Sequence, residues 1–122
     1  MKKILLIEDD KDQVNLYKAR FELEGYAFLS ASNGPDGLKL AETGKPDIIL
    51  IDLLMQGMDG IEVLGHLKDA PKTKGIPAVM VTNLDKHDLA KKAMDLGARD
   101  FIVKSSVSLR DMIARVEHVL QQ

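Results

Sequence analysis

The chain has 122 residues, of which 45% are hydrophobic and 30% are charged, and its formal net charge is −2. This length suits one domain with a buried core and is too short for two. The composition gives no electrostatic reason for direct nucleic-acid binding, the absence of cysteine excludes disulfides and zinc–thiolate sites, and no apolar stretch approaches membrane-spanning length. We therefore expect residues 1–122 to form a single cytoplasmic domain that contacts no membrane.

Five apolar runs along the chain predict β-strands. They have strand length and are rich in Ile, Val and Leu, which is typical of strands buried on both faces of a parallel sheet. Helical segments follow each of them. The expected strands are Lys3–Ile7, Tyr26–Ala31, Asp47–Ile51, Ala78–Thr82 and Asp100–Val103.

Five segments with helical periodicity follow these strands, and most begin at a polar capping residue. The expected helices run from near Lys11 to Glu24, from the cap Asn33 to about Glu42, from the cap Asp59 to about Lys68, from the cap Asp85 to Gly97, and from the cap Ser108 through Val119. Capping-box spacing occurs in the pairs Asp59/Glu62, Asp85/Asp88 and Ser108/Asp111. Strict alternation of strand and helix predicts an α/β fold with a doubly wound parallel sheet, helices on both faces and right-handed crossovers.

Four of the expected strands lead into polar residues. The acidic cluster Glu8–Asp10 follows the first strand, Asp52 follows the third, Thr82 ends the fourth, and Lys104 follows the fifth. Because the carboxyl ends of parallel strands meet at one edge of a sheet, these side chains should converge there. Carboxylates, a hydroxyl and an ammonium at one edge suit a divalent metal ion and a phosphoryl group.

The carboxylates of Glu8, Asp9 and Asp52 would repel one another at this edge. Two carboxylates about 4 Å apart repel by roughly 4 kcal/mol at an effective dielectric constant near 20. A cation removes this cost, and an oxygen-only cluster suits Mg²⁺. A carboxylate beside Mg²⁺ can attack phosphorus to form an aspartyl phosphate, while an ammonium and a hydroxyl neutralise the phosphoryl oxygens.

These motifs, in this order, resemble the receiver domain of two-component response regulators of the chemotaxis-regulator type. The resemblance covers essentially the whole chain. It implies a (βα)5 flavodoxin-like fold with strand order 2-1-3-4-5 and a phosphorylation-activated switch with no attached output domain. The segments that carry it are Ile7–Asp10, Lys45–Asp52, Met55–Gly60, Val81–Thr82 and Gly97–Lys104.

The resemblance implies a role for each residue at the acidic end of the site. Asp52 is the implied phosphoacceptor. Asp9 would bind Mg²⁺ directly, Glu8 would bind it through water, and the backbone carbonyl of Leu54 would be a further ligand. The donor would be a sensor histidine kinase, a histidine phosphotransfer protein or a small acyl phosphate.

The resemblance also implies how the switch responds. Thr82 and Lys104 would contact the phosphoryl oxygens, and Phe101 would change rotamer on activation. The changed surface would be that of the fourth helix, fifth strand and fifth helix, which would act on an unknown downstream protein. The chain would be a monomer or a weak, phosphorylation-dependent dimer.

Several residues beside the site depart from the family pattern. Ser105 follows Lys104 where the family usually has proline in a cis peptide, so a trans peptide or a more mobile loop is expected. Gln56 replaces another usual proline, which loosens the loop beside Asp52. Asn83 stands where a small residue is usual and should narrow access to the phosphoacceptor.

Leu54 and Leu84 occupy the two positions that flank the path of the hydrolytic water in this family. Neither side chain can orient water by hydrogen bonding, and Asn83 should crowd the path further. Since the positioning of a reactant can change a rate by factors of about ten to a hundred, we expect slow self-dephosphorylation.

Helix capping and core packing are the competing interpretations of these residues. Asp10 is expected to be a helix cap. Thr82 and Lys104 could be ordinary strand-end residues, and Phe101 could equally be a core aromatic. The three histidines have no shared spacing and are expected on the surface.

Three other functions are compatible with parts of this pattern. A Mg²⁺-dependent phosphatase of the haloacid-dehalogenase type also uses a strand-end Asp with Thr and Lys, but its second Asp would fall at Leu54. A flavodoxin-like cofactor binder needs a phosphate-binding loop where this chain has Glu8–Asp10. A receiver-like docking module that is not phosphorylated would normally lack Asp52 or the acid pair.

Overall fold

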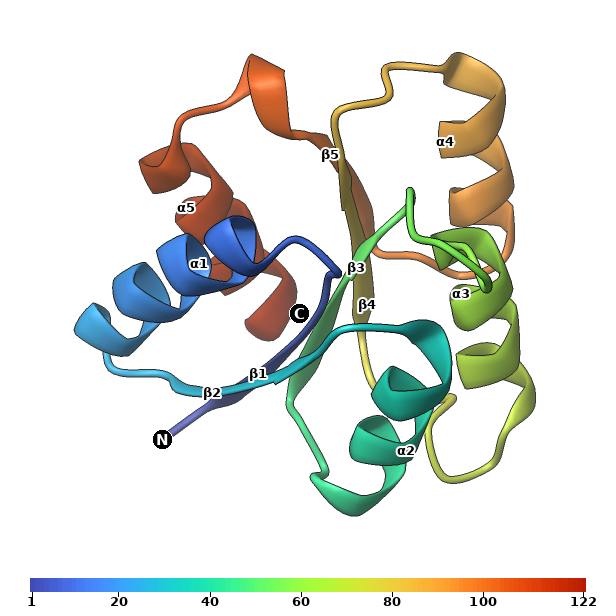
Figure 1. Ribbon diagram of the computed structural model, residues 1–122, viewed down its shortest axis with the longest axis horizontal. Coiled ribbons are helices and arrows are strands. Elements are labelled where there is room, and N and C mark those ends of the chain that lie inside the picture. The colour runs from blue at the N-terminus through green and yellow to red at the C-terminus, as the bar shows by residue number, and fades with distance from the viewer.

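The computed structural model covers residues 1–122 and has three layers, with a parallel sheet between two layers of helices (Figure 1). The strand order is β2-β1-β3-β4-β5, as predicted, and all neighbouring strands are parallel. Two strands differ from their predicted boundaries by one residue. Strand β2 begins at Ala27 rather than Tyr26, and β3 runs from Ile48 to Asp52 rather than from Asp47 to Ile51. The strands are β1 (Lys3–Ile7), β2 (Ala27–Ala31), β3 (Ile48–Asp52), β4 (Ala78–Thr82) and β5 (Asp100–Val103).

Five α-helices cover the sheet, and the loop after β5 contains a short 3-10 helix, η1. Helices α1 and α5 lie on one face, and α2, α3 and α4 lie on the other (Figure 1). No helix combines the length and the apolar character needed to cross a membrane. The helices are α1 (Lys11–Leu23), α2 (Gly34–Thr43), α3 (Gly60–Asp69), α4 (His87–Asp95), η1 (Lys104–Ser106) and α5 (Leu109–Leu120).

Each face of the sheet carries its own hydrophobic core, because successive side chains of a strand point to opposite faces. Ile4 and Leu6 of β1 pack beneath α1 and α5, whereas Leu5 and Ile7 pack beneath α2, α3 and α4. Each core contains 13 buried residues, so neither face of the sheet is left to solvent. This double burial explains the continuous apolar runs of β1 and β3.

Polar side chains cap four of the five helices as predicted. Side-chain oxygens of Asp10, Asn33, Asp59 and Ser108 accept backbone N–H groups from the first turns of α1, α2, α3 and α5. Glu62 completes the capping box of Asp59, whereas the Ser108 pair makes only the first of the two capping-box bonds. These caps fix where each helix leaves the carboxyl edge of the sheet.

The predicted start of α4 is wrong. Lys86, not Asp85, holds the cap position and makes no side-chain capping bond, so Asp88 completes no capping box. The backbone N–H of Leu84 donates to Oγ1 of Thr82 at 3.1 Å. This bond holds the chain in a turn just before Asp85, which stays exposed in the loop.

Helix α3 begins in direct contact with the end of β3. The backbone N–H of Gly60 donates to the carbonyl of Leu53 at 3.0 Å. A Cβ atom at Gly60 would lie 2.5 Å from the carbonyl oxygen of Asp52, so only glycine permits this approach. The contact fixes the loop that carries Leu54.

Candidate functional site

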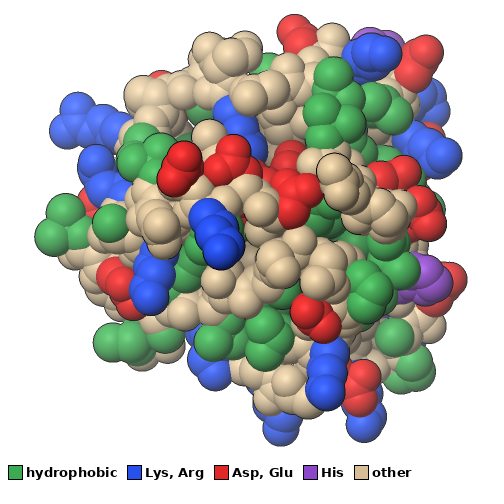
Figure 2. Space-filling view, in the orientation of Figure 1, with side chains coloured by type: hydrophobic (Ala, Val, Ile, Leu, Met, Phe, Trp, Pro, Cys, Tyr) green, Lys and Arg blue, Asp and Glu red, His purple; other side chains and the backbone are tan.

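Three carboxylates meet at the carboxyl edge of the sheet, as predicted. One oxygen from each of Glu8, Asp9 and Asp52 lies within 4.8 Å of the others. The pairing of Ile7 with Ile51 places the residues that follow them, Glu8 and Asp52, side by side. Glu8 is 2% exposed and Asp52 is 8% exposed, whereas Asp9 is exposed. Figure 2 shows acidic side chains gathered on this face over the ends of the strands.

The ammonium of Lys104 is the cation nearest to this cluster. Its Nζ donates to Oε1 of Glu8 at 2.8 Å and lies 4.0 Å from Oδ1 of Asp52. The Lys104–Ser105 peptide is trans, since the structure contains no cis peptide bond. The side chain of Lys104 is only 11% exposed, so the pair with Glu8 is shielded from solvent.

One positive charge does not balance three carboxylates, and the pKa of Asp52 reflects this. The pKa of Asp52 is raised to about 7, first by burial and then by the hydrogen bond with Glu8 and the negative charge of Glu8, while the charge of Lys104 and the N–H of Leu54 oppose the shift. Burial also raises the pKa of Glu8, but the hydrogen bonds with Lys104 and Asp52 outweigh burial and lower it. Without a metal, Asp52 is therefore partly protonated near neutral pH.

A cavity of about 230 Å³ opens above these groups. Thr82 at its wall is fully buried. Leu84 and Phe101 do not line the cavity; both are half-buried and pack against the core under α2, α3 and α4, so their proposed roles stay predictions. The residues that line it are Glu8, Asp9, Asp10, Gln13, Asp52, Leu54, Thr82, Asn83 and Lys104.

Two residues of α1 join the site that the sequence pattern did not single out. Oε1 of Gln13 lies 3.4 Å from Nζ of Lys104, and the ring centroid of Tyr17 lies 5.9 Å from the same atom. Their spacing of four residues puts them on one helix face, which is the only signal the sequence offers. The direction of that face depends on tertiary packing.

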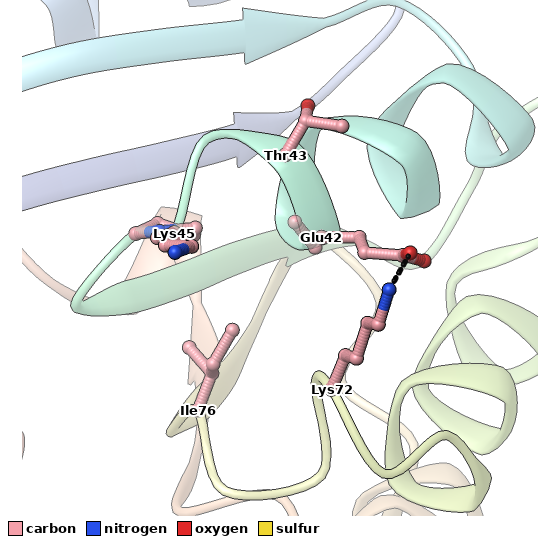
Figure 3. A pocket seen from close by; sticks show the side chains of 7 residues that line it. Glu42, Thr43, Lys45, Lys72 and Ile76 are labelled. Atoms are coloured by element: carbon pink, nitrogen blue, oxygen red, sulfur yellow. Dashed lines mark hydrogen bonds and ion pairs between the residues drawn. The ribbon is translucent and has the colours of Figure 1, made fainter.

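A larger cavity, of about 530 Å³, lies at the opposite edge of the sheet, between the end of α2 and the loop before β4 (Figure 3). Lys72 and Glu42 form an ion pair of 3.1 Å beside it, and their side chains are 75% and 49% exposed. No buried charged residue lines this cavity. The acidic cavity, and not the larger one, therefore contains the buried carboxylates, hydroxyl and ammonium that could bind a metal ion and a phosphoryl group. The three histidines are exposed, as predicted.

Comparison with known proteins gives a consistent result. The family model for the response regulator receiver domain matches residues 4–117. Response regulator PleD of Caulobacter vibrioides is 40% identical over 102 residues, which are 84% of this chain and 22% of PleD. Protein PilH of Pseudomonas aeruginosa is 34% identical over 104 residues, 85% of this chain and 86% of PilH. The chain thus spans less than a quarter of PleD but most of PilH.

Solved structures give the same fold. The receiver domain of Francisella response regulator 1452 superposes with a TM-score of 0.90 at 28% identity, covering 99% of this chain and 98% of that one. The chemotaxis protein CheY4 of Vibrio cholerae superposes with a TM-score of 0.91, covering 98% of each chain, but its 22% identity shows the fold alone. With the acidic cavity at the predicted edge of the sheet, the family match identifies the chain as a member of the response regulator receiver domain family, the phosphorylation-activated switches of two-component signalling.

Proposed function

We propose that Asp52 accepts a phosphoryl group in a Mg²⁺-dependent reaction. The observation that carries this proposal is the position of the Asp52 carboxylate, which lies in a cavity of about 230 Å³ between the acid pair and the Lys104 ammonium. Receiver domains interact with histidine kinases or phosphotransfer proteins, and we propose such a protein, or a small acyl phosphate, as the donor. Asp52 lines this cavity, and its pKa is raised to about 7, with burial as the largest cause.

The three carboxylates supply the hard oxygen donors that Mg²⁺ prefers. Receiver domains bind Mg²⁺ through acidic pocket residues, and Glu8, Asp9 and Asp52 form such a cluster. We propose that Asp9 and Asp52 hold the ion directly, that Glu8 holds it through water, and that the carbonyl of Leu54 is a further ligand. When bound, the ion supplies positive charge that keeps Asp52 ionised and neutralises phosphoryl oxygens.

The transfer itself requires few groups. A carboxylate oxygen of Asp52 forms a bond to phosphorus while the bond from phosphorus to the donor nitrogen, or to the acyl oxygen, breaks and leaves its electron pair on the donor. The ammonium of Lys104 moves from Glu8 toward a phosphoryl oxygen. The hydroxyl of Thr82 donates a hydrogen bond to another phosphoryl oxygen, and its oxygen still accepts the N–H of Leu84.

The response of the switch is proposed to begin at Thr82 and to end at Phe101. Thr82 and Phe101 lie on the neighbouring strands β4 and β5, and Phe101 is only half-buried, which leaves its ring room to turn. Arg115 of α5 pairs with Asp100 at 2.8 Å and thereby ties β5 to α5. We propose that the surface of α4, β5 and α5 changes on phosphorylation and binds a downstream protein or a second copy of the chain.

The entrance to the cavity supports a long-lived phosphorylated state. Leu54 and Asn83 line the cavity, and the Leu54 side chain is 56% exposed, so an apolar group stands where water enters. Leu84 packs close by against the core. We propose that Leu54 and Leu84 slow hydrolysis because neither side chain can align a water molecule, and that Asn83 narrows the path of the water.

The donor is proposed to approach along α1. A groove of about 270 Å³ between α1 and α5 adjoins the acidic cavity, and Leu16 at its side is 52% exposed. Leu23, seven residues further on the same helix, is 80% exposed. Two exposed leucines on one helix face support the docking of an apolar helical surface that brings the donor histidine to the cavity.

Mass spectrometry after incubation with acetyl phosphate and Mg²⁺ tests the proposal. We expect a single phosphate adduct in the wild type and none in Asp52→Asn. The matched control is Asp85→Asn, which alters an exposed carboxylate in the loop after β4 and should keep the adduct. An adduct that persists in Asp52→Asn would show that another residue is the acceptor.

The phosphatase alternative is not favoured, because the position of its general acid holds Leu54 and the family match is to receiver domains. An assay of a generic phosphomonoester should show no sustained turnover. Yellow colour in the purified protein would instead support a flavin-binding function.

A further inference from the structure

The ammonium of Lys104 is held on several sides. It has three N–H groups, and the acceptors around it are Oε1 of Glu8 at 2.8 Å, Oε1 of Gln13 at 3.4 Å and Oδ1 of Asp52 at 4.0 Å. The carboxylates attract it from the β1 and β3 side, and Gln13 holds it from the α1 side. The position of the ammonium is therefore set partly by α1, a helix that contains none of the three clustered carboxylates.

The aromatic ring of Tyr17 forms a further wall. Nζ of Lys104 lies 5.9 Å from the ring centroid, within the range over which a cation is attracted to an aromatic face. Tyr17 is only 4% exposed and belongs to the core under α1 and α5, so its ring is fixed by packing. A fixed ring restricts the lysine more effectively than a mobile surface residue could.

Gln13 and Lys104 also separate two hollows of the surface. Both residues line the acidic cavity, and both line the neighbouring groove, together with Asn83. Tyr17 lines the groove but not the acidic cavity. Without Gln13 and the ring, the long side chain of Lys104 could turn from the acidic cavity into the groove, where its ammonium would be solvated and out of reach of Asp52.

We propose that Tyr17 and Gln13 are positioning residues that hold the ammonium of Lys104 at the acidic cavity, ready to meet the phosphoryl group on Asp52. This inference rests on the proposed function, in which Lys104 contacts that group. Neither residue touches the reacting atoms. They act by restricting the lysine, and because small misplacements of a catalytic group lower rates strongly, their loss should slow the transfer.

The test compares four variants in the full chain, namely Tyr17→Leu, Tyr17→Phe, Gln13→Leu and Gln13→Glu. The rate of phosphorylation is measured at saturating Mg²⁺ over a range of acetyl phosphate concentrations, which separates kcat from KM. The Kd for Mg²⁺ is measured in parallel. In the unphosphorylated protein, NMR follows the ε-methylene protons of Lys104, which a nearby aromatic ring shifts from their ordinary position.

We expect Tyr17→Leu and Gln13→Leu to lower kcat by roughly five- to tenfold with KM for acetyl phosphate and the Kd for Mg²⁺ nearly unchanged. Tyr17→Phe keeps the ring and should recover most of the rate. Gln13→Glu keeps an oxygen acceptor for Lys104 but adds a negative charge to the cavity, so at saturating Mg²⁺, which offsets that charge, it should recover part of the rate. The Lys104 resonance should move toward its ordinary position in Tyr17→Leu and stay in Tyr17→Phe.

Wild-type kcat in both leucine variants, or a Lys104 resonance that does not move in Tyr17→Leu, would overturn the inference. So would a fall in kcat that is matched by an equal loss of Mg²⁺ affinity, because that would indicate a general disturbance of the acid cluster. Gln13 lies at the surface end of the contact, so its variant tests the inference even if Tyr17→Leu does not fold. Absence of any phosphorylation in the wild type would count against the proposed function, while the NMR shift would still report on the positions of Tyr17 and Lys104.

Discussion

The two edges of the sheet contain the same kind of ion pair in opposite surroundings. At the carboxyl edge, Lys104 and Glu8 are 11% and 2% exposed, and at the amino edge, Lys72 and Glu42 are 75% and 49% exposed. Solvent screens the pair of Lys72 and Glu42, which therefore contributes little to the stability of the fold. The first pair sits among further carboxylates in a buried place, where an unbalanced charge is costly. Burial of unbalanced charge, rather than the size of a cavity, thus marks the functional edge.

Removal of the lysine from each pair should break this comparison most strongly. Lys104→Met leaves Glu8 and Asp52 buried without a cation, and we expect the free energy of unfolding in metal-free buffer at pH 8 to fall by about 3 kcal/mol. Lys72→Met should change it by less than about 1 kcal/mol. Urea denaturation measures both. Equal losses in the two variants would mean that burial does not distinguish the two edges.

Two glycines of α3 sharpen the comparison within one helix. Gly60→Ala places Cβ 2.5 Å from the carbonyl oxygen of Asp52, so the loop beside the site must shift, and we expect a loss of about 2 kcal/mol with weaker Mg²⁺ binding. Gly65→Ala meets no atom within 4 Å and should stabilise the helix by up to about 1 kcal/mol. Thermal unfolding and Mg²⁺ titration of both variants check this. A Gly60→Ala protein as stable as Gly65→Ala would contradict the close contact.

Polar residues at the cavity entrance should shorten the life of the phosphorylated state. In Leu54→Asn with Leu84→Glu, side chains that can hydrogen-bond to water replace two that cannot, and we expect hydrolysis to accelerate about tenfold. The loss of phosphate in excess Mg²⁺ is followed by mass spectrometry. Leu54→Met with Leu84→Met, which keeps both groups apolar, is the control. An unchanged or slower rate in the polar variant would refute the role of the leucines.

The smallest expected effect on stability is that of Thr82→Ala, which should cost about 1 kcal/mol because the N–H of Leu84 loses its acceptor. The variant should still accept phosphate at Asp52, but NMR spectra of α4 and β5 should respond far less to phosphorylation. In the proposed switch, the hydroxyl of Thr82 is the contact that differs between the two states, and a ligand shifts an equilibrium only through such differences. Thr82→Ser, which keeps the hydroxyl, should respond like the wild type. A full response in Thr82→Ala would exclude Thr82 as the coupling residue.

The sequence predicts the sheet and the acidic cavity well because both depend on local patterns. Continuous apolar runs identify β1 and β3, and the polar residues directly after the strands must meet when the strands are parallel and in register. Asp52 and Lys104 could therefore be brought together without coordinates. The caps Asp10, Asn33 and Asp59 were predictable for the same reason, since a cap is a local bond between a side chain and the next turn.

What the sequence does not predict depends on contacts between distant elements. Helix α4 begins one residue later than predicted because Oγ1 of Thr82, at the end of β4, accepts the N–H of Leu84 and holds the following residues in a turn. The contacts of Gln13 and Tyr17 with Lys104 join α1 to the end of β5 across about ninety residues of chain. Helical periodicity places two residues on a common face but cannot tell which distant side chain that face meets.

The central claim is that the carboxylates at the carboxyl edge carry more negative charge than Lys104 balances, so that a bound cation stabilises the fold. The most direct test is to measure the free energy of unfolding from pH 5 to pH 8 with and without Mg²⁺. The pKa of Asp52 is raised by burial to about 7, above the value of 3.8 for an unperturbed carboxyl, so the folded protein binds the proton more tightly than the unfolded chain. Stability contributed by this proton is complete at low pH and is lost as the pH rises through 7.

We predict that wild-type protein without metal loses stability between pH 5 and pH 8, that saturating Mg²⁺ restores it at pH 8, and that Asp52→Asn loses little stability over the same range and gains less from Mg²⁺. A wild type whose stability without metal does not fall toward pH 8, and which Mg²⁺ does not stabilise there, would contradict the claim.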